Sequence, residues 1–456
     1  MNKQELKAET AKYQSSPVDT DMSVDTDMSI DTDMSVDTDM SIDADMLKWL
    51  RTTIEAAQVP FDSKFDFWTG ESISVKGVNA ERSITIAIKD PGVISQVVKT
   101  RDTLVLLEHL VAGTLKITGS MDDAVTLFRK LHQTEFVQTE QFIQWVKELQ
   151  GNELFLPTQS WEKLTVDSQE RNKEVIKFHY DVGNDFYKLW LDPSMAYSCA
   201  RFERDDMTLE EAQLAKLDAI CKKLLLKPGE KLLDIGCGWG ALIKRAATKY
   251  GAICHGITLS EEQLAHNKEW IAREGLSDKV TVELLNYRNL QFDGVFDKVS
   301  SIGMVEHVGI ANYPIYYKNI MNALKPGGLF LNHGIAVNSH FMPQTKFILR
   351  YVFPDGQAPF VSSYLDAAQK GGFEIVDLDC WRPHYVKTLR AWAHNLDNKV
   401  DAAKAIMGER TLIWQFYLYF TAQCFEHGYN SVYQMLLKRS DDGLWNLPMT
   451  RNDWLS

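Results

Sequence analysis

Glu306 and His307 follow directly after the apolar stretch VFDKVSSIGMV, which spans residues 295–305. A carboxylate at the edge of a buried core must be hydrogen-bonded, paired with a cation or bound to a ligand, because burying it bare is costly. We therefore expect Glu306 to hold a partner that takes part in chemistry. The alternative is that Glu306 only caps the turn that follows.

A second candidate site is the glycine-rich stretch LLDIGCGWG at residues 232–240. Gly236, Gly238 and Gly240 let the backbone turn tightly and approach a ligand closely. The spacing G-x-G-x-G, with Asp234 before it, differs from the dinucleotide fingerprint G-x-G-x-x-G, and the next strand, AICHGIT, ends without the acid of a dinucleotide site. The motif resembles the S-adenosylmethionine site of class I methyltransferases, in which the acid lies near the methionine amino end. A purely structural turn is the alternative.

Both candidate sites require a scaffold that places strand ends side by side. From Phe178 onward, short apolar runs alternate with helical patterns. The runs are KLLDIGCGWG, AICHGITLS, KVTVELLNY, FDKVSSIGMV and GGLFLNHGI, and the helical patterns are ALIKRAATKYG, EEQLAHNKEWIAREG and YPIYYKNIMNALKPGG. This alternation predicts an α/β fold with a doubly wound parallel sheet, whose ligands bind at the carboxyl ends of the strands.

The chain divides into four segments. Residues 1–46 contain five copies of an acidic hexapeptide, such as SVDTDM, and are expected to form a disordered tail. Residues 47–150 predict a small α/β domain, 151–177 a linker, and 178–445 the catalytic domain. Weak binding of divalent cations, or masking of a basic surface, are the alternative functions of the tail.

Charge and composition exclude several classes of protein. Residues 1–46 hold three Lys against ten Asp and two Glu, a charge of −9 out of the total of −13, so the rest of the chain carries only −4. No basic face for nucleic acid is expected. None of the six cysteines forms a C-x-x-C pair, which favours a reduced, cytoplasmic location. No signal peptide, spanning helix or metal motif is recognised; the aromatic run TLIWQFYLYFTAQCF predicts a buried helix.

Longer motifs narrow the function. HYDVGNDFYKLWLDPSMAYSCARF begins at His179, GITLSEEQ at Gly256, GMVEHVG at Gly303, LNHGI at Leu331 and HYVKTLRAW at His384. In this order they resemble cyclopropane-fatty-acyl-phospholipid synthases and the related mycolic acid cyclopropane synthases, over residues from about 178 to 440. The small N-terminal domain resembles, more weakly, the lipid-associated domain of the bacterial phospholipid enzymes.

The resemblance implies a reaction. The methyl group of S-adenosylmethionine is attacked by a cis double bond of a phospholipid acyl chain, and a base removes a proton so that a ring closes. In the family the base is a bound bicarbonate. Carried over, the side chains of Glu306, His333 and Tyr385 and the backbone amides of Cys199 and Ile335 hold that ion. A satisfied core histidine and a buried tyrosine are the alternatives for His333 and Tyr385.

The same resemblance assigns the cofactor contacts. Tyr197 and Ser198 lie on a flap over the cofactor, and Thr258 and Gln263 contact its ribose and methionine ends, together with Asp234, Gly236 and Gly238. The family commonly has Asp-Tyr-Arg where this chain has Asn286, Tyr287 and Arg288, so the contact to the adenine amine is expected to change. Five aromatic residues are candidates for the wall of an acyl tunnel: Phe186, Trp190, Tyr316, Tyr317 and Trp392.

Three other functions remain open. A methyltransferase on the same scaffold leaves a branched methyl or methylene product, a related fold methylates small amines, and a lipid-binding protein has no active site. For a cyclopropane synthase the expected partners are a phospholipid membrane, bound peripherally, and an unsaturated acyl chain. A homodimer is implied by the resemblance alone.

Overall fold

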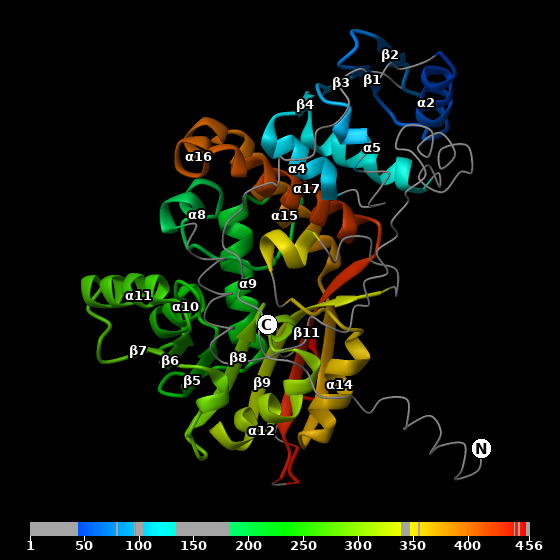
Figure 1. Cartoon of the computed structure of the whole chain (residues 1–456). Helices are drawn as coiled ribbons and strands as arrows, with labels where there is room; N and C mark the ends of the chain where they lie inside the picture. Colours follow the sequence, from blue (N-terminus) through cyan, green and yellow to red (C-terminus); the bar gives the residue numbers. More distant parts are fainter. Residues whose placement is uncertain are drawn as a thin grey trace, which may run out of the picture. The chain divides into compact units, whose positions relative to one another are not determined.

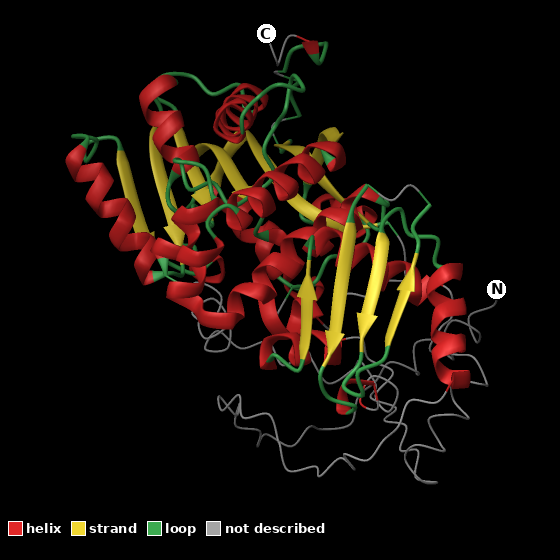
Figure 2. Ribbon diagram, turned by 90° about the horizontal axis from the view of Figure 1, so that it is seen from above, coloured by secondary structure: helices red, strands yellow, loops and turns green. Residues whose placement is uncertain are grey.

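Two β-sheets organise the chain in the computed structural model, which describes residues 44–78, 81–94, 96, 104–133, 183–338, 347–353, 356–441, 443–445 and 447–452. All of them belong to one unit, Ser41–Ser456. The predicted linker and nearly all of the predicted tail lie outside the described residues. Figure 2 shows the two sheets as separate groups of strands.

The smaller sheet belongs to the N-terminal domain and has the order β2-β1-β3-β4. Its elements are α2 (Ala44–Ala56), β1 (Asp62–Asp66), β2 (Ser72–Val75), β3 (Ser83–Ile88), α4 (Leu104–Ala112), β4 (Leu115–Thr118) and α5 (Met121–Gln133). The sequence patterns LKWLRTTIEAAQV, SITIAIKD, VISQVVKTRDTLVLLEHLVAG and TLKITGSMDDAVTLFRKL predict a helix, a strand, a helix, and a strand followed by a helix, and these overlap α2, β3, α4, β4 and α5. Helix α2 begins three residues before the predicted domain boundary. The patterns missed β1 and β2, which are short and largely polar.

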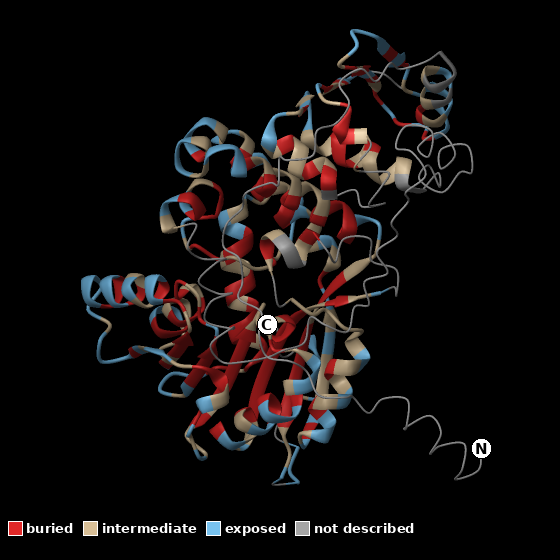
Figure 3. Ribbon diagram, viewed as in Figure 1, coloured by how far each residue is buried: buried red, intermediate tan, exposed pale blue. Residues whose placement is uncertain are grey.

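The larger sheet has seven strands in the order β10-β11-β9-β8-β5-β6-β7. They are β5 (Lys231–Ile235), β6 (Ile253–Thr258), β7 (Val280–Leu284), β8 (Phe296–Ile302), β9 (Leu324–Val337), β10 (Phe373–Cys380) and β11 (Asn430–Arg439). The five strands predicted from the apolar runs are confirmed. The sheet is not wholly parallel, because β11 runs antiparallel to both β9 and β10. Figure 3 shows the central strands as buried.

Helices cover both faces of the larger sheet, as Figure 1 shows. They are α9 (Leu209–Lys223), α10 (Ala241–Lys249) and α11 (Glu261–Arg273) on one face, and α12 (Tyr313–Ala323) and α14 (Val361–Lys370) on the other. Four further helices pack in a separate buried cluster: α8 (Asn184–Trp190), α15 (Arg382–Asp397), α16 (Val400–Met407) and α17 (Thr411–Glu426). Side chains alternate between the faces along each strand. Leu232 packs in the core beneath α9, α10 and α11, whereas its neighbour Leu233 packs in the core beneath α12 and α14.

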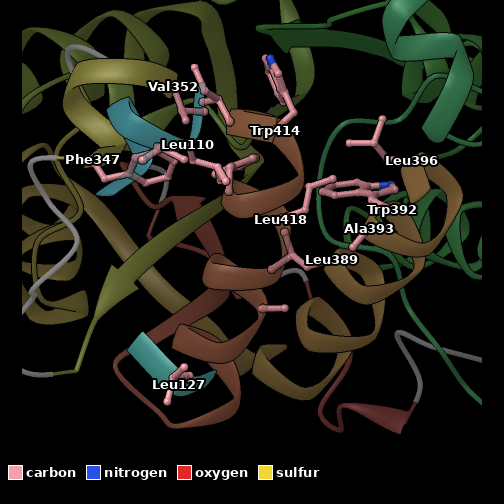
Figure 4. Close-up of a cluster of buried hydrophobic side chains, with 14 of the residues drawn as sticks. Leu110, Leu127, Phe347, Val352, Leu389, Trp392, Ala393, Leu396, Trp414 and Leu418 are labelled. Carbon is pink, nitrogen blue, oxygen red and sulfur yellow. The ribbon is translucent and has the colours of Figure 1, made fainter. Parts of the chain in front are cut away.

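The aromatic helix α17 joins the small domain to the catalytic domain. Figure 4 shows side chains of α4, α15 and α17 converging in one buried cluster. Gln423 on α17 is 3 % exposed, and its amide nitrogen donates to the Asp122 carboxylate at 2.8 Å, while its oxygen accepts from Arg129 at 3.1 Å. The predicted buried aromatic helix is therefore confirmed. Among the described residues, no helix combines the length and apolarity needed to cross a bilayer.

Candidate active site

A cavity opens where β5, β6, β7 and β8 end, at the edge predicted for a ligand of a doubly wound sheet. It is lined by all eight residues assigned to the cofactor: Tyr197, Ser198, Asp234, Gly236, Gly238, Thr258, Gln263 and Asn286. Residues that lie up to 89 positions apart, from Tyr197 to Asn286, therefore meet at one place, which we call the cofactor cavity.

The glycine-rich turn after β5 forms one wall of the cofactor cavity. Gly238 has a φ of +56°, a left-handed conformation that favours glycine. Gly240 has a φ of +89°, and a Cβ there would lie 2.1 Å from Asn267 Oδ1. Asn267 is fully buried and donates from Nδ2 to the Gly238 carbonyl at 2.8 Å, so it holds the turn. Nothing in the sequence motif identified Asn267.

Asp234 is the acid of the motif and is 2 % exposed. Its carboxylate accepts a hydrogen bond of 2.7 Å from Ser300 Oγ on the neighbouring strand. Burial raises the pKa of Asp234 to about 6, although the Ser300 bond and the charge of Lys216 oppose that shift. Asp234 is thus ionised at neutral pH and provides a buried negative charge in the cavity, as a cationic amino group requires.

Thr258 and Gln263 lie on the opposite wall. Thr258 Oγ1 donates to Gln263 Oε1 at 2.7 Å, which fixes the side-chain amide. Gln263 Nε2 is buried and has no hydrogen-bond partner among the residues that the structure describes. It is a donor to a ligand in the cavity. Asn286 Oδ1 accepts from the Arg288 backbone amide at 2.9 Å.

The predicted flap is tied down from two sides. Tyr197 hydroxyl donates to Tyr417 hydroxyl on α17 at 3.2 Å. Lys216 Nζ on α9 donates to Ser198 Oγ at 2.9 Å. Lys216 lines the cavity, is 2 % exposed, and burial lowers its pKa to about 8. The sequence analysis missed this lysine, because LEEAQLAKLDAICKK gives no sign of which of its lysines are buried.

The five residues assigned to catalysis come from four separate segments. Glu306 lies in the short helix η5 (Val305–His307), His333 and Ile335 on β9, Cys199 before α9, and Tyr385 in the first turn of α15. Gly334 lies between His333 and Ile335 on β9, and a Cβ there would lie 3.5 Å from Glu306 Oε2, so this part of β9 passes beside the carboxylate. Cys199 Sγ lies 3.8 Å from the carbonyl oxygen of Trp381, the residue before α15. Burial is the main cause that raises the pKa of the Tyr385 hydroxyl, and Tyr417, Cys199 and Glu306 add to it. We call the five residues the reaction site.

Glu306 answers the question that its position in the sequence raised. It is 7 % exposed, and its Oε2 has no hydrogen-bond partner among the described residues. A Cβ at Gly334 would lie 2.2 Å from Val305 Cγ1, so only glycine lets β9 approach this closely. Burial raises the pKa of Glu306 to about 7, and the backbone amides of Glu306 and Ile335 oppose that shift only in part. Within the part of the chain that the structure describes, Glu306 forms no salt bridge, and its Oε2 is left for a ligand.

His333, like Glu306, is a buried side chain with one polar atom left for a ligand. It is 1 % exposed, and its Nε2 has no partner among the described residues. Burial lowers the pKa of His333 to about 3, and the nearby charges of Lys216 and Lys223 lower it further, so the imidazole is neutral. Cys199 is buried and burial raises the pKa of its thiol, so a thiolate nucleophile is disfavoured there.

The candidate tunnel residues fall into two groups. Phe186, Trp190 and Trp392 pack in one buried cluster, with Trp190 and Trp392 ring centroids 5.7 Å apart. Tyr197, which lines the cofactor cavity, packs edge to face against Trp190 and at a tilt against Trp392. Tyr316 and Tyr317 lie on α12 and pack in the other buried cluster, apart from these three residues. The acyl tunnel itself stays a prediction.

The residues of the two sites fit the groups expected to bind there, S-adenosylmethionine in the cofactor cavity and bicarbonate in the reaction site. The cofactor cavity offers an ionised carboxylate, a free amide donor and aromatic walls, which suit an ammonium group and a nucleoside. The reaction site offers a free acceptor at Glu306 and a free nitrogen at His333. A small anion that carries a hydroxyl has groups complementary to such a pair.

Comparison with known proteins agrees with this geometry. A family model described as mycolic acid cyclopropane synthetase matches residues 167–435. The chain is 39 % identical to a probable fatty acid methyltransferase of Pseudomonas putida over 416 residues, which cover 90 % of this chain and 99 % of that protein. It is 37 % identical to cyclopropane mycolic acid synthase 3 of Mycobacterium tuberculosis, covering 58 % and 96 %. The solved structure of mycolic acid cyclopropane synthase CmaA1, complexed with SAH and CTAB, aligns with a TM-score of 0.56 at 35 % identity and covers 58 % and 98 %.

Proposed function

The chain belongs to the mycolic acid cyclopropane synthetase family of S-adenosylmethionine-dependent enzymes, and from this membership we propose that it converts a cis double bond of phospholipid acyl chains into a cyclopropane ring. A bound bicarbonate is the proposed base. The observation that carries the proposal is the pair of buried, unpartnered polar atoms, Glu306 Oε2 and His333 Nε2, beside a cavity suited to the cofactor.

S-adenosylmethionine, when bound, supplies the methyl group that the double bond accepts. Asp234 pairs with its amino group, Gln263 donates to its polar end, and the glycine-rich turn leaves room for the nucleoside. That SAH was found with a relative at 35 % identity supports this use of the cavity. Tyr197 and Trp239 both line the cavity and pack against Tyr187, so an aromatic layer separates the cofactor from water.

The reaction site holds the base and keeps it dry. Glu306 accepts from the hydroxyl of the bicarbonate, while His333 and Tyr385 donate to its oxygens. Removal of a proton by such a small, fixed base requires that no bulk water compete for the cationic substrate. The aromatic cluster around Trp190 and Trp392 supplies that environment and stabilises positive charge on the acyl chain.

The substrate and its location extend the proposal. Cyclopropane mycolic acid synthase 3 matches 58 % of this chain along 96 % of its own length, whereas the Pseudomonas putida relative matches 90 % of this chain, so the latter extends beyond a segment of the size of the catalytic domain. We take the small N-terminal domain as the module that presents a membrane phospholipid, with the enzyme bound peripherally. The acidic tail is then expected to weaken binding to anionic lipid at low salt.

A second product is favoured by one observation. The Pseudomonas putida relative, 99 % of whose length aligns with this chain, is named a probable fatty acid methyltransferase. On that precedent the transferred carbon stays as a branched methyl or methylene group. Loss of a proton from a neighbouring chain carbon leaves a methyl-branched alkene that keeps all three methyl hydrogens. Loss of a proton from the transferred methyl without ring closure leaves a methylene group, which keeps two hydrogens but, unlike a cyclopropane, is reduced by mild hydrogenation.

Lipids from cells that express the chain and grow on methyl-deuterated methionine distinguish these outcomes. We expect acyl chains that gain one carbon, resist hydrogenation and keep two of the three deuterium atoms, as ring closure requires. A product that keeps all three deuterium atoms establishes methyl branching. A lipid fraction without label overturns both, and purified protein with vesicles and bicarbonate then tests whether the cell lacked the substrate.

A further inference from the structure

Three polar side chains form a row across the buried end of the larger sheet. Asp379 on β10 lies opposite Gln434 on β11, and Gln434 lies opposite His333 on β9. Paired positions on neighbouring strands project to the same face. Lys223, the last residue of α9, contributes an ammonium group to this row. Gln434 and His333 are each 1 % exposed, and Lys223 is 2 % exposed.

Lys223 fixes the orientation of the Gln434 amide. Its Nζ donates to Asp379 Oδ2 at 2.8 Å and to Gln434 Oε1 at 2.8 Å. An ammonium group only donates, so the oxygen of the Gln434 amide must face Lys223 and the nitrogen must face away. Asp379 is itself held by the Trp381 indole, which donates to the same oxygen at 2.8 Å.

The Gln434 amide nitrogen lies 3.1 Å from His333 Nδ1. An amide NH2 only donates, so Nδ1 must be the bare, accepting nitrogen of the ring. A neutral imidazole then carries its proton on Nε2. This is the nitrogen that has no partner among the described residues.

We propose that Gln434, oriented by Lys223, is a positioning residue that keeps His333 in its Nε2–H tautomer. The reaction site then presents a donor at His333 and an acceptor at Glu306, which together match a hydroxyl-bearing anion in one orientation. The opposite tautomer would turn a lone pair toward the anion and repel it. The part of this inference that concerns the anion rests on the proposed function, whereas the tautomer itself does not.

The tautomer is measurable by NMR on the full chain labelled with 15N-histidine. Protonated and bare ring nitrogens resonate in separate 15N ranges, and the His333 signals are assigned by their loss in His333→Gln. We expect a protonated Nε2 and a bare Nδ1 in the wild type. In Gln434→Glu, which preserves volume, the new carboxylate accepts a proton from Nδ1, so Nδ1 is expected to become protonated.

Gln434→Met and Gln423→Met form a matched pair, because both remove a buried glutamine but only Gln434 contacts His333. Gln434→Met is expected to abolish the preference for Nε2–H and to raise the bicarbonate concentration for half-maximal lipid modification about tenfold, as loss of a hydrogen bond to a charged group predicts. Gln423→Met should leave the His333 signals unchanged.

A wild-type His333 protonated on Nδ1, or His333 signals that do not respond to either Gln434 variant, would overturn the proposal. If the expected tautomer is found but no lipid product forms with or without bicarbonate, the proposed function fails and the positioning of His333 by Gln434 stands.

Discussion

The cofactor cavity and the reaction site differ in how their polar atoms are satisfied and in how far apart their residues lie in the sequence. In the cofactor cavity Asp234 is bonded to Ser300, Thr258 to Gln263 and Asn286 to a backbone amide. In the reaction site Glu306 Oε2 and His333 Nε2 are buried without a partner among the described residues. A largely satisfied cavity keeps its shape when empty, whereas the reaction site leaves two buried polar atoms that the proposed anion would satisfy.

The largest effect is expected from Glu306→Gln, which keeps the volume of the side chain but replaces its carboxylate by an amide. The hydroxyl of the proposed base then loses its charged acceptor, and the amide NH2 is a donor where the carboxylate only accepted. We expect lipid modification to fall by about 10³-fold, within the range for a positioned acid or base. Affinity for S-adenosylhomocysteine should stay within about twofold. Labelled lipid analysis and titration calorimetry measure the two quantities.

If Glu306→Gln weakened S-adenosylhomocysteine binding by as large a factor as it lowers lipid modification, the cofactor cavity and the reaction site would act as one unit. Glu262→Gln is the matched control, because Glu262 is an exposed acid on α11 outside the reaction site. It should change neither quantity.

The next effect is on stability. The folded-state pKa of Glu306, about 7, lies above its ordinary 4.5, so the folded protein holds this proton more tightly than the unfolded chain. The resulting stabilisation is present below pH 4.5 and is lost as the pH rises through 7, by about 3 kcal/mol at most. Glu306→Gln removes this loss.

We therefore expect the difference in melting temperature, Glu306→Gln minus wild type, to become more positive as the pH rises from 5 to 8 in bicarbonate-free buffer. Asp234, whose pKa is raised to about 6 by burial, shifts stability in the same direction but is present in both proteins and cancels. A difference that does not change with pH would mean that Glu306 is not an uncompensated buried acid. Added bicarbonate should stabilise the wild type more than the variant.

A smaller effect is expected in the cofactor cavity from Gln263→Ala. Loss of the free Nε2 donor, and of the partner of Thr258, should weaken S-adenosylhomocysteine about tenfold, the cost of roughly one hydrogen bond. The number of deuterium atoms in the lipid product should be unchanged, because the reaction site is intact. A changed deuterium count would contradict the separation of the two regions.

The difference between the cofactor cavity and the reaction site also explains which residues could be predicted from the sequence. The cofactor residues lie in short motifs in which chemistry and turn geometry are specified together, and all eight reach one cavity. Glu306 was recognised because a charge after an apolar strand requires a partner. The strand and helix order followed from hydrophobic periodicity, which depends only on neighbouring residues.

What could not be predicted depends on pairing between distant segments. The row of Asp379, Gln434 and His333 exists only because β11 inserts antiparallel between β10 and β9, and no local pattern marks that register. Lys216 and Lys223 are seven residues apart on α9 and both buried, yet they resemble the surface lysines of an amphipathic helix.

The smallest effect is expected from Asn286→Asp, at the one position where this chain departs from the family motif. Asn286 lines the cofactor cavity, is 7 % exposed and already accepts a hydrogen bond through Oδ1, so a carboxylate occupies the same volume. A charged acceptor binds an amine more strongly than a neutral one, and we expect S-adenosylhomocysteine to bind a few times more tightly. The gain should vanish with S-inosylhomocysteine, which lacks the adenine amine. If the variant binds both ligands more weakly, the desolvation of the new charge outweighs its bond, and the adenine amine does not contact residue 286.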